Sequence, residues 1–310
     1  MKPKNKLLSF STTIRNPERY AEFLLAIEKF SGLPYDNHLL LEIEKELISL
    51  GIYRPLKRER WVEEKWNKKE RLDQLTVKKI MVDNPQKFGW EWRAETHLAP
   101  LKELAFIKIK SGKFLITKLG LALLADDLNI NDFYTKILLK VQFGNPFRKT
   151  VDNKSNPLLL TLSIIKSVNL TWKEIGKKPV GISRTEFQYF VLPMVDNNYK
   201  FIAEEIIASR KKFGFSFNEN YLVDFTLRQL NNNKRSKNIK ETSEAYTDNV
   251  IRHFCLTNLI LIYSRENEQF VDISEGSAQV VKEIFSKFKL EWKNFVNEDE
   301  YVDFLLSNKN

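Results

Sequence analysis

Residues 96–124 read THLAPLKELAFIKIKSGKFLITKLGLALL, and this stretch decides the expected fold. It begins with apolar side chains at helical spacing, and residues 105–110 then alternate between apolar and basic side chains. A Ser-Gly pair follows as a turn, a short apolar run returns at 114–116, and helical spacing resumes at 119–124. The pattern predicts a helix, a two-stranded hairpin and a second helix, which is the order of a winged-helix module.

The same order recurs near the other end of the chain. A helical pattern at 243–256 precedes a strand pattern at 259–263, a turn at 266–267, a second strand pattern at 270–273 and a helical pattern from 277 onward. The two stretches share no close identity, so the recurrence lies in their architecture. We therefore expect a mainly α fold with small β wings, of the α+β class, built from tandem winged-helix or helix-turn-helix-like modules.

Helix-end signals support this organisation. Pro17 stands at a first helical position, and Asp36 precedes a second helical pattern that runs to Gly51, so the two predict a helical hairpin. Ser183 with Glu186 forms a capping box before an apolar run. The intervening stretch from 53 to 89 is polar and charged with scattered Trp, and it fits either a surface helix or a loop ordered by a partner.

These patterns predict three parts of the chain. Residues 1–150 would form a first recognition module, with the helical hairpin and a winged helix, and residues 151–290 a second winged-helix-like module. Residues 291–310 are acidic and would form a C-terminal segment.

Composition limits the partners and the compartment. The 50 Lys and Arg residues outnumber the 40 Asp and Glu residues, which gives a net charge of +10. The basic excess gathers in 54–93 and 205–240, where solvated helix faces and a polyanion-binding surface both explain it. The apolar runs are far shorter than the roughly 18 residues of a membrane span. No secretory signal is evident at the N-terminus, and Cys255 stands alone, so we expect a cytoplasmic protein without disulfides or membrane contact.

Catalytic patterns are weak in this sequence. The glycines form no phosphate-binding loop, and the three histidines show no metal-ligand spacing. Asp272 with Glu291 and Lys293 matches a nuclease spacing only loosely, because charged residues are frequent and Glu291 follows a helical pattern rather than a strand. We therefore expect no catalytic residue, no metal ligand and no cofactor among these residues.

Seven stretches together resemble the recognition region of the AlwI-type type IIS restriction endonucleases, a family that includes nicking enzymes. They occur in order along nearly the whole chain: STTIRNPERY at 11–20, WRAETHLAPLKELAFI at 92–107, FLITKLGLALL at 114–124, LLKVQFGNPF at 138–147, NPLLLTLSIIKSVN at 156–169, GISRTEFQYFVLPMV at 181–195 and YTDNVIRHFCLTNLI at 246–260.

The resemblance implies sequence-specific binding of double-stranded DNA at a short asymmetric site, by a monomer. It also implies a Mg²⁺-dependent nuclease domain that is not in this chain, with the acidic end near the linker to it. Two other functions stay open at this point. One is a stand-alone winged-helix transcriptional regulator, which would dimerise on a palindrome, and the other is cleavage by the chain itself.

Residue type and placement predict the DNA contacts. Arg pairs well with guanine and Asn or Gln with adenine, whereas hairpin lysines suit phosphates. The N-terminal block could read bases or merely cap a helix; its candidates are Thr12, Thr13, Arg15 and Asn16. The first helix and wing contribute Arg93, Glu95, Thr96, His97, Lys102, Lys108, Lys110 and Lys113. The connection and the second module contribute Gln142, Asn145, Arg148, Ser183, Arg184, Thr185, Gln188, Asn249, Arg252 and His253.

Overall fold

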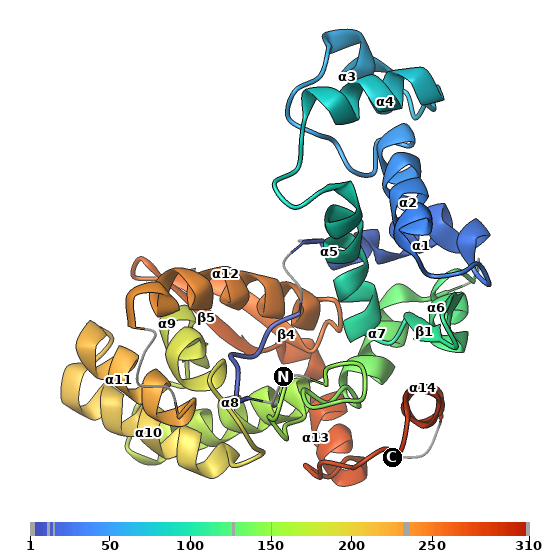
Figure 1. Ribbon diagram of the computed structural model, residues 1–310. Helices are drawn as coiled ribbons and strands as arrows, with labels where there is room; N and C mark the ends of the chain where they lie inside the picture. The colour runs from blue at the N-terminus through green and yellow to red at the C-terminus, as the bar shows by residue number, and fades with distance from the viewer. Residues whose placement is uncertain are drawn as a thin grey trace. The chain divides into compact units, whose positions relative to one another are not determined.

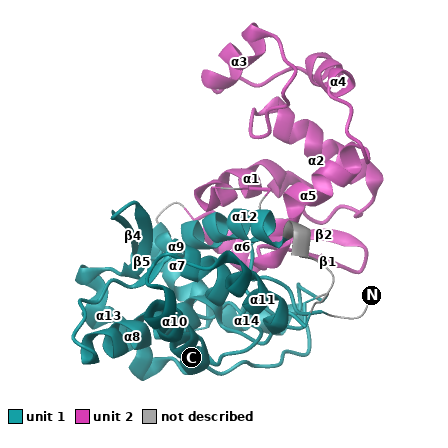
Figure 2. Cartoon of the chain, turned by 90° about the vertical axis from the view of Figure 1, so that its left-hand side faces the viewer, with its two compact units in different colours: residues 1–12, 129–310 teal, residues 13–128 magenta. Residues whose placement is uncertain are grey.

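The structure is a computed structural model that describes residues 4–10, 13–14, 16–125, 128–149, 151–231 and 236–307. It forms two compact units (Figure 2). Unit 2 comprises residues 13–128, and unit 1 comprises residues 1–12 together with 129–310. These packing units divide earlier than residue 150, and the N-terminal residues pack with the second part of the chain. The proposed recognition modules of 1–150 and 151–290 stay a prediction.

Unit 2 is a set of helices with one small hairpin (Figure 1). Its first helix begins at Pro17, as expected, and Asp36 caps the second by accepting from Leu39 N at 2.8 Å. Its elements are η1 (Pro17–Arg19), α1 (Tyr20–Ile27), η2 (Glu28–Phe30), α2 (Asn37–Ser49), α3 (Arg60–Asn67), α4 (Gln74–Asp83), α5 (Trp90–Glu103), β1 (Ile107–Lys110), β2 (Lys113–Ile116) and α6 (Lys118–Leu123).

Unit 1 is also mainly helical and contains a three-stranded antiparallel sheet in the order β3-β5-β4. The predicted hairpin turn lies at Glu266 and Asn267, both at positive φ. Its elements are α7 (Ile130–Leu138), α8 (Pro157–Glu174), β3 (Ile182–Ser183), α9 (Arg184–Glu186), the π-helical turn η3 (Phe187–Val191), α10 (Tyr199–Phe213), α11 (Glu219–Gln229), α12 (Ser236–Cys255), β4 (Ile260–Arg265), β5 (Glu268–Ile273), η4 (Glu275–Ser277), α13 (Ala278–Lys287) and α14 (Glu298–Leu306).

The two units share one order of elements. Each has a helix, a short extended segment, a second helix, two further helices, a long helix, a hairpin and a final helix. The short extended segment pairs with the second hairpin strand in both: Pro34 bridges Lys113, and Ile182 pairs with Val271. Helix α5 in unit 2 therefore corresponds to α12 in unit 1, and the hairpin β1–β2 to β4–β5. The repeat is longer than the helix-wing-helix pattern that the sequence indicates.

Residues 54–89, which we call the arm, form the helices α3 and α4 (Figure 1). Their apolar faces bury Val62, Trp66, Val77 and Ile80 in a small core that also includes Ile48 of α2. Of the two possibilities open from the sequence, the arm thus takes the helical one.

The acidic end packs on unit 1. The helix α14 buries Tyr301 and Leu305 completely and Val302 nearly so. Tyr301 Oη accepts a hydrogen bond from Gln142 N at 3.0 Å, and Lys140 Nζ donates to Ser307 O. Residues 298–306 are therefore part of the core of unit 1, which the acidic composition alone does not predict.

A bilayer span needs a helix that is both long and apolar. Over the described residues, no helix has both the length and the apolar character to cross a membrane.

Candidate nucleic-acid interface

A polar trio joins two predicted residues of helix α5 to Tyr35. Lys102 Nζ donates to Glu95 Oε2 at 2.9 Å and to Tyr35 Oη at 2.7 Å, and the Tyr35 hydroxyl donates to Glu95. Burial, with the hydrogen bond to Glu95, raises the pKa of Tyr35, so its hydroxyl stays a donor near neutral pH. The structure thus brings Glu95 and Lys102 together. Tyr35 was not predicted, because it precedes the α2 cap and looks like a loop residue.

Arg93 and Thr96 are partly exposed on the same helix. The Arg93 guanidinium lies 4.8 Å from the centre of the Tyr53 ring, and its Nε is buried without a hydrogen-bond partner in the described residues. Thr96 Oγ1 donates to Arg93 O at 2.7 Å, which is an intrahelical bond. A stacked guanidinium keeps its outer donors in a fixed direction, which suits recognition of a planar base edge.

His97 turns inward on α5 and is 2% exposed. Its Nδ1 lies 2.9 Å from Glu44 Oε2, and its ring centre lies 4.6 Å from that of Tyr53. Its position two residues from Glu95 puts it on a different face of the helix, because successive helical residues turn by about 100°. His97 is therefore a core residue and not the base contact that the sequence suggests.

The hairpin β1–β2 carries the predicted lysines. Lys110 and Lys113 pair across its tip and are exposed, and Lys108 is partly exposed. Such side chains reach phosphates without displacing the backbone pairing. The unit 2 hairpin therefore offers a basic edge.

The N-terminal block is only partly described. Asn16 Oδ1 accepts from Glu18 N at 3.1 Å, so this residue caps η1, while Thr13 is partly exposed. Capping is thus one role of Asn16. Thr12 and Arg15 lie outside the described residues.

The start of α9 in unit 1 is held by the predicted capping box. Glu186 N donates to Ser183 Oγ at 3.1 Å, and Ser183 N donates to Glu186 Oε2 at 2.7 Å. Ser183 is completely buried, so it holds the turn and offers no side chain to a ligand. The box instead fixes the two residues that follow it.

Those two residues, Arg184 and Thr185, are partly exposed and meet two other elements. Arg184 forms an ion pair with Asp248 of α12, and Thr185 Oγ1 donates to Glu268 of β5 at 3.3 Å. Neither acid was predicted from sequence, because an isolated Asp or Glu on a helix or strand is common. The start of α9, helix α12 and the hairpin therefore converge on one polar surface.

Helix α12 has a charged face that is exposed and a second face that is buried. Its exposed residues include Asp248 and the predicted contact Arg252. The predicted Asn249 and His253 are 4% and 0% exposed. Asn249 Oδ1 accepts from Phe10 N at 3.1 Å, and the His253 ring stacks on the Phe10 ring with centres 4.3 Å apart. Both are thus anchors for the N-terminal segment.

Other predicted contacts are also in the core. Gln188 Nε2 donates to Ser243 Oγ at 2.8 Å, Asn145 Nδ2 to Gln142 O at 2.8 Å, and Arg148 to Ser9 O. The buried set, which we assign to the core rather than to the interface, is His97, Gln142, Asn145, Arg148, Ser183, Gln188, Asn249 and His253. Their side chains form hydrogen bonds with buried groups and so connect segments that are distant in the sequence.

The loose nuclease motif gains no support from the geometry. Asp272 accepts from Asn169 Nδ2 at 2.9 Å, and burial raises its pKa. Lys293 Nζ lies 4.8 Å from the centre of the Phe304 ring. Within the described ranges, no three His, Cys, Asp or Glu residues cluster in a way that could hold a metal ion.

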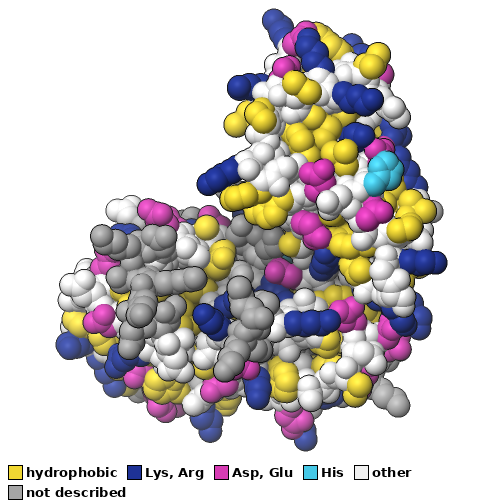
Figure 3. Space-filling model, in the orientation of Figure 1, with side chains coloured by type: hydrophobic (Ala, Val, Ile, Leu, Met, Phe, Trp, Pro, Cys, Tyr) yellow, Lys and Arg dark blue, Asp and Glu magenta, His cyan; other side chains and the backbone are white. Residues whose placement is uncertain are grey.

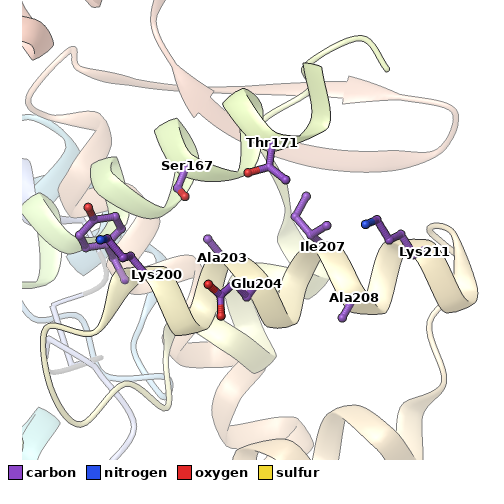
Figure 4. A pocket seen from close by; sticks show the side chains of 9 residues that line it. Ser167, Thr171, Lys200, Ala203, Glu204, Ile207, Ala208 and Lys211 are labelled. Atoms are coloured by element: carbon purple, nitrogen blue, oxygen red, sulfur yellow. The ribbon is translucent and has the colours of Figure 1, made fainter. Parts of the chain in front are cut away.

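A groove of about 480 Å³ lies between α8 and α10 (Figure 4). Lys200 and Lys211 lie toward its two ends, with Glu204 between them and Ser167 and Thr171 on the α8 side. None of the predicted DNA contacts lines it. The acid between the lysines weakens its attraction for an anion.

Comparisons with known proteins address the fold and the family. A search of the curated proteins found no match. Among solved structures, the chain is similar to the BpuJ1 endonuclease binding domain, crystallised with pyrene- and phenanthrene-modified DNA. The TM-score is 0.51 at 13% identity, over 98% of this chain and 94% of that chain. This likeness shows a shared fold.

The family model described as AlwI restriction endonuclease matches residues 102–309, which is more than half of the chain. The chain therefore belongs to the AlwI restriction endonuclease family.

Proposed function

We propose that the chain binds double-stranded DNA in a sequence-specific way and is the recognition part of a type IIS restriction or nicking endonuclease. The observation that carries the proposal is the element order shared by the two units, with a long helix directly before an antiparallel hairpin in each. Family membership and the fold shared with an endonuclease binding domain support it.

Each unit would act as a winged-helix module. In this arrangement the helix before the hairpin enters the major groove and the hairpin lies beside the phosphates. Helices α5 and α12 would then read bases, and the hairpins β1–β2 and β4–β5 would be the wings. The short extended segment that pairs with the second hairpin strand in both units supports this assignment.

The exposed side chains on those helices define the candidate reading residues. On α5 these are the partly exposed Arg93, Glu95, Thr96 and Lys102, and on α12 the exposed Asp248 and Arg252. Carboxylates accept from cytosine N4 and guanidinium groups donate to guanine. Arg184 and Thr185, at the start of α9, complete the polar surface beside α12.

The two modules carry different side chains on their reading helices, so one chain presents two different surfaces to a duplex. A site read in this way is asymmetric, and a monomer suffices to read it. This supports the asymmetric site over the palindrome that a dimeric regulator would select. Cleavage with Mg²⁺ would belong to a nuclease domain outside these residues.

Selection of bound duplexes from a random pool by the purified chain tests the proposal. We expect one enriched asymmetric motif of a few base pairs, bound by a monomer in analytical ultracentrifugation. Enrichment of a palindrome by a dimer would favour the transcriptional regulator, and no enrichment would refute sequence-specific binding. Supercoiled plasmid incubated with the chain and Mg²⁺ should stay intact; nicking or linearisation would assign cleavage to these residues.

A further inference from the structure

We propose that the arm, residues 54–89, is an additional DNA-binding surface that contacts the phosphate backbone beside the recognised sequence. This inference rests on the proposed function and adds a partner surface that neither reading helix supplies. The arm precedes residue 102, where the family match begins.

The arm has a core of its own at the end of α2. Trp66 is 2% exposed and packs against Gly51, and Val62, Val77 and Ile80 belong to the same buried cluster. In unit 1 the two helices at the equivalent place are α10 and α11, and the long contact of α10 with α8 makes them part of the main core. The arm therefore exposes more of its surface than its counterpart does.

Three of the six acidic groups of the arm are already neutralised by arginines and one lysine. Arg54 and Arg58 bind Glu63, Arg60 binds Glu64 at 3.1 Å, and Lys79 binds Glu59 at 2.6 Å. Hydrogen bonding from Lys79 lowers the pKa of Glu59, and hydrogen bonding from Arg58 lowers that of Glu63. These carboxylates therefore stay ionised and paired, and they do not offset the remaining lysines.

Six lysines of the arm remain without a carboxylate partner among the described residues. Five of them are exposed and Lys65 is partly so; the set is Lys57, Lys65, Lys68, Lys69, Lys78 and Lys87. Two of the ammonium groups lie beside aromatic rings. Lys65 Nζ is 5.6 Å from the centre of the Trp61 ring, and Lys87 Nζ is 5.2 Å from that of the Phe88 ring. Figure 3 shows dark blue side chains spread over this part of the chain, with yellow ones between them. A surface of this kind attracts phosphates without reading bases.

The arm also exposes apolar side chains, which would suit a protein partner rather than DNA. Leu56, Leu75 and Val82 are 92%, 78% and 77% exposed. On α4, however, Leu75 and Val82 flank Lys78 at helical spacing, so the apolar row is interrupted by charge. The unpaired lysines therefore favour a polyanion over an apolar protein surface, and variants of the two kinds of side chain separate these partners.

The backbone of Lys69 offers a sharp test. Glu70 N donates to Lys65 O at 2.9 Å and Lys69 N to Trp66 O at 3.0 Å, which is a Schellman ending of α3. Lys69 occupies its left-handed position with φ +59°, where glycine is more favourable. Lys69→Gly therefore removes a charge and relieves strain in one change.

The experiment compares the chain with Lys68→Ala/Lys69→Gly/Lys78→Ala/Lys87→Ala on two duplexes. Both contain the selected site; one has long flanks and the other is trimmed to the site. We expect the variant to bind the long duplex about tenfold or more weakly at low salt and the trimmed one less than twofold more weakly. The slope of log K against log salt should fall by about 0.9 for each phosphate that the variant no longer neutralises.

Two controls make the outcomes distinct. Lys69→Gly alone should raise the melting temperature while weakening long-duplex binding, which no folding defect can do. Leu75→Ser/Val82→Ser removes apolar surface and should leave DNA affinity unchanged. Equal affinities of the chain and its lysine variant for the long duplex would overturn the proposal, as would weaker binding by the apolar pair. If the unaltered chain binds no duplex, the proposed function itself fails.

Discussion

Arg210 of α10 and Glu186 of α9 form an ion pair in which both side chains are completely buried. Arg210 Nε and Nη2 donate to the two carboxylate oxygens at 2.7 Å each, and Nη2 also donates to Gly181 O at 2.7 Å. The same carboxylate closes the capping box with Ser183. One buried arginine thus fixes the turn that presents Arg184 and Thr185.

Arg210→Met should lower the free energy of unfolding by about 3–5 kcal/mol, because it leaves the Glu186 carboxylate buried without a counter-charge. Urea denaturation at pH 7 measures this decrease. The double variant Glu186→Gln/Arg210→Met removes both charges and should recover part of it. A decrease below about 1 kcal/mol in the single variant would mean that Glu186 is not held by this pair.

Gly51→Ala should lower the free energy of unfolding more than Gly32→Ala does. Both glycines have positive φ, +68° and +94°, so each substitution costs about 1–2 kcal/mol in backbone energy. A Cβ at Gly51 would lie 2.5 Å from Trp66, whereas nothing lies within 4 Å of a Cβ at Gly32. The extra cost is about 1–3 kcal/mol. Urea denaturation of both variants measures this difference, and equal decreases in the free energy of unfolding would contradict the close packing.

Local signals predicted the elements well. Pro17, Asp36 and the Ser183–Glu186 box each mark a helix start within a few residues, and each acts where the sequence places it. The hairpins followed from alternation and turn residues. These signals depend on neighbours in the chain, which is why they can be read without the fold.

The assignment of side chains to the interface was less successful because it depends on long-range contacts. Asn249 looks like a base reader, yet it binds the backbone of Phe10, 239 positions away. Glu95 and His97 are two positions apart on α5, yet Glu95 is partly exposed and His97 is buried in the core. The arm was undecided because its apolar residues suffice for a core only when α3, α4 and the end of α2 come together.

Lowering the pH from 7 to 5 should cost about 2 kcal/mol of stability through His253. Burial, with a smaller contribution from Arg148, lowers the pKa of His253 from 6.5 to about 4. Between those pH values the unfolded chain binds a proton that the folded chain does not. The contribution of His253 to the free energy of unfolding is therefore fully present above pH 6.5 and decreases as the pH falls. Urea denaturation at both pH values measures this. His253→Phe keeps a ring against Phe10 and should show a smaller pH dependence; an unchanged dependence would assign it to other groups.

Arg252→Ala should weaken binding to the selected site by about 1–3 kcal/mol and relax preference at one base pair, because Arg252 is exposed on the proposed reading helix α12. Fluorescence anisotropy with the site and its single-base variants measures both effects. Arg265→Ala, in the β4–β5 hairpin, is the matched control and should weaken all these duplexes alike. Uniform weakening by Arg252→Ala would place Arg252 at a phosphate instead.

Lys113→Ala should weaken binding to every duplex by a similar factor. Lys113 is exposed in the β1–β2 hairpin, and its backbone pairs with Lys110 and bridges Pro34, so removal of the side chain leaves the hairpin intact. An ammonium group at a phosphate adds affinity by releasing counterions, so the slope of log K against log salt should fall by about 1. Titrations at several salt concentrations measure the slope, and Lys113→Arg should preserve it. Weakening confined to one base pair, with the slope unchanged, would show that this hairpin reads sequence.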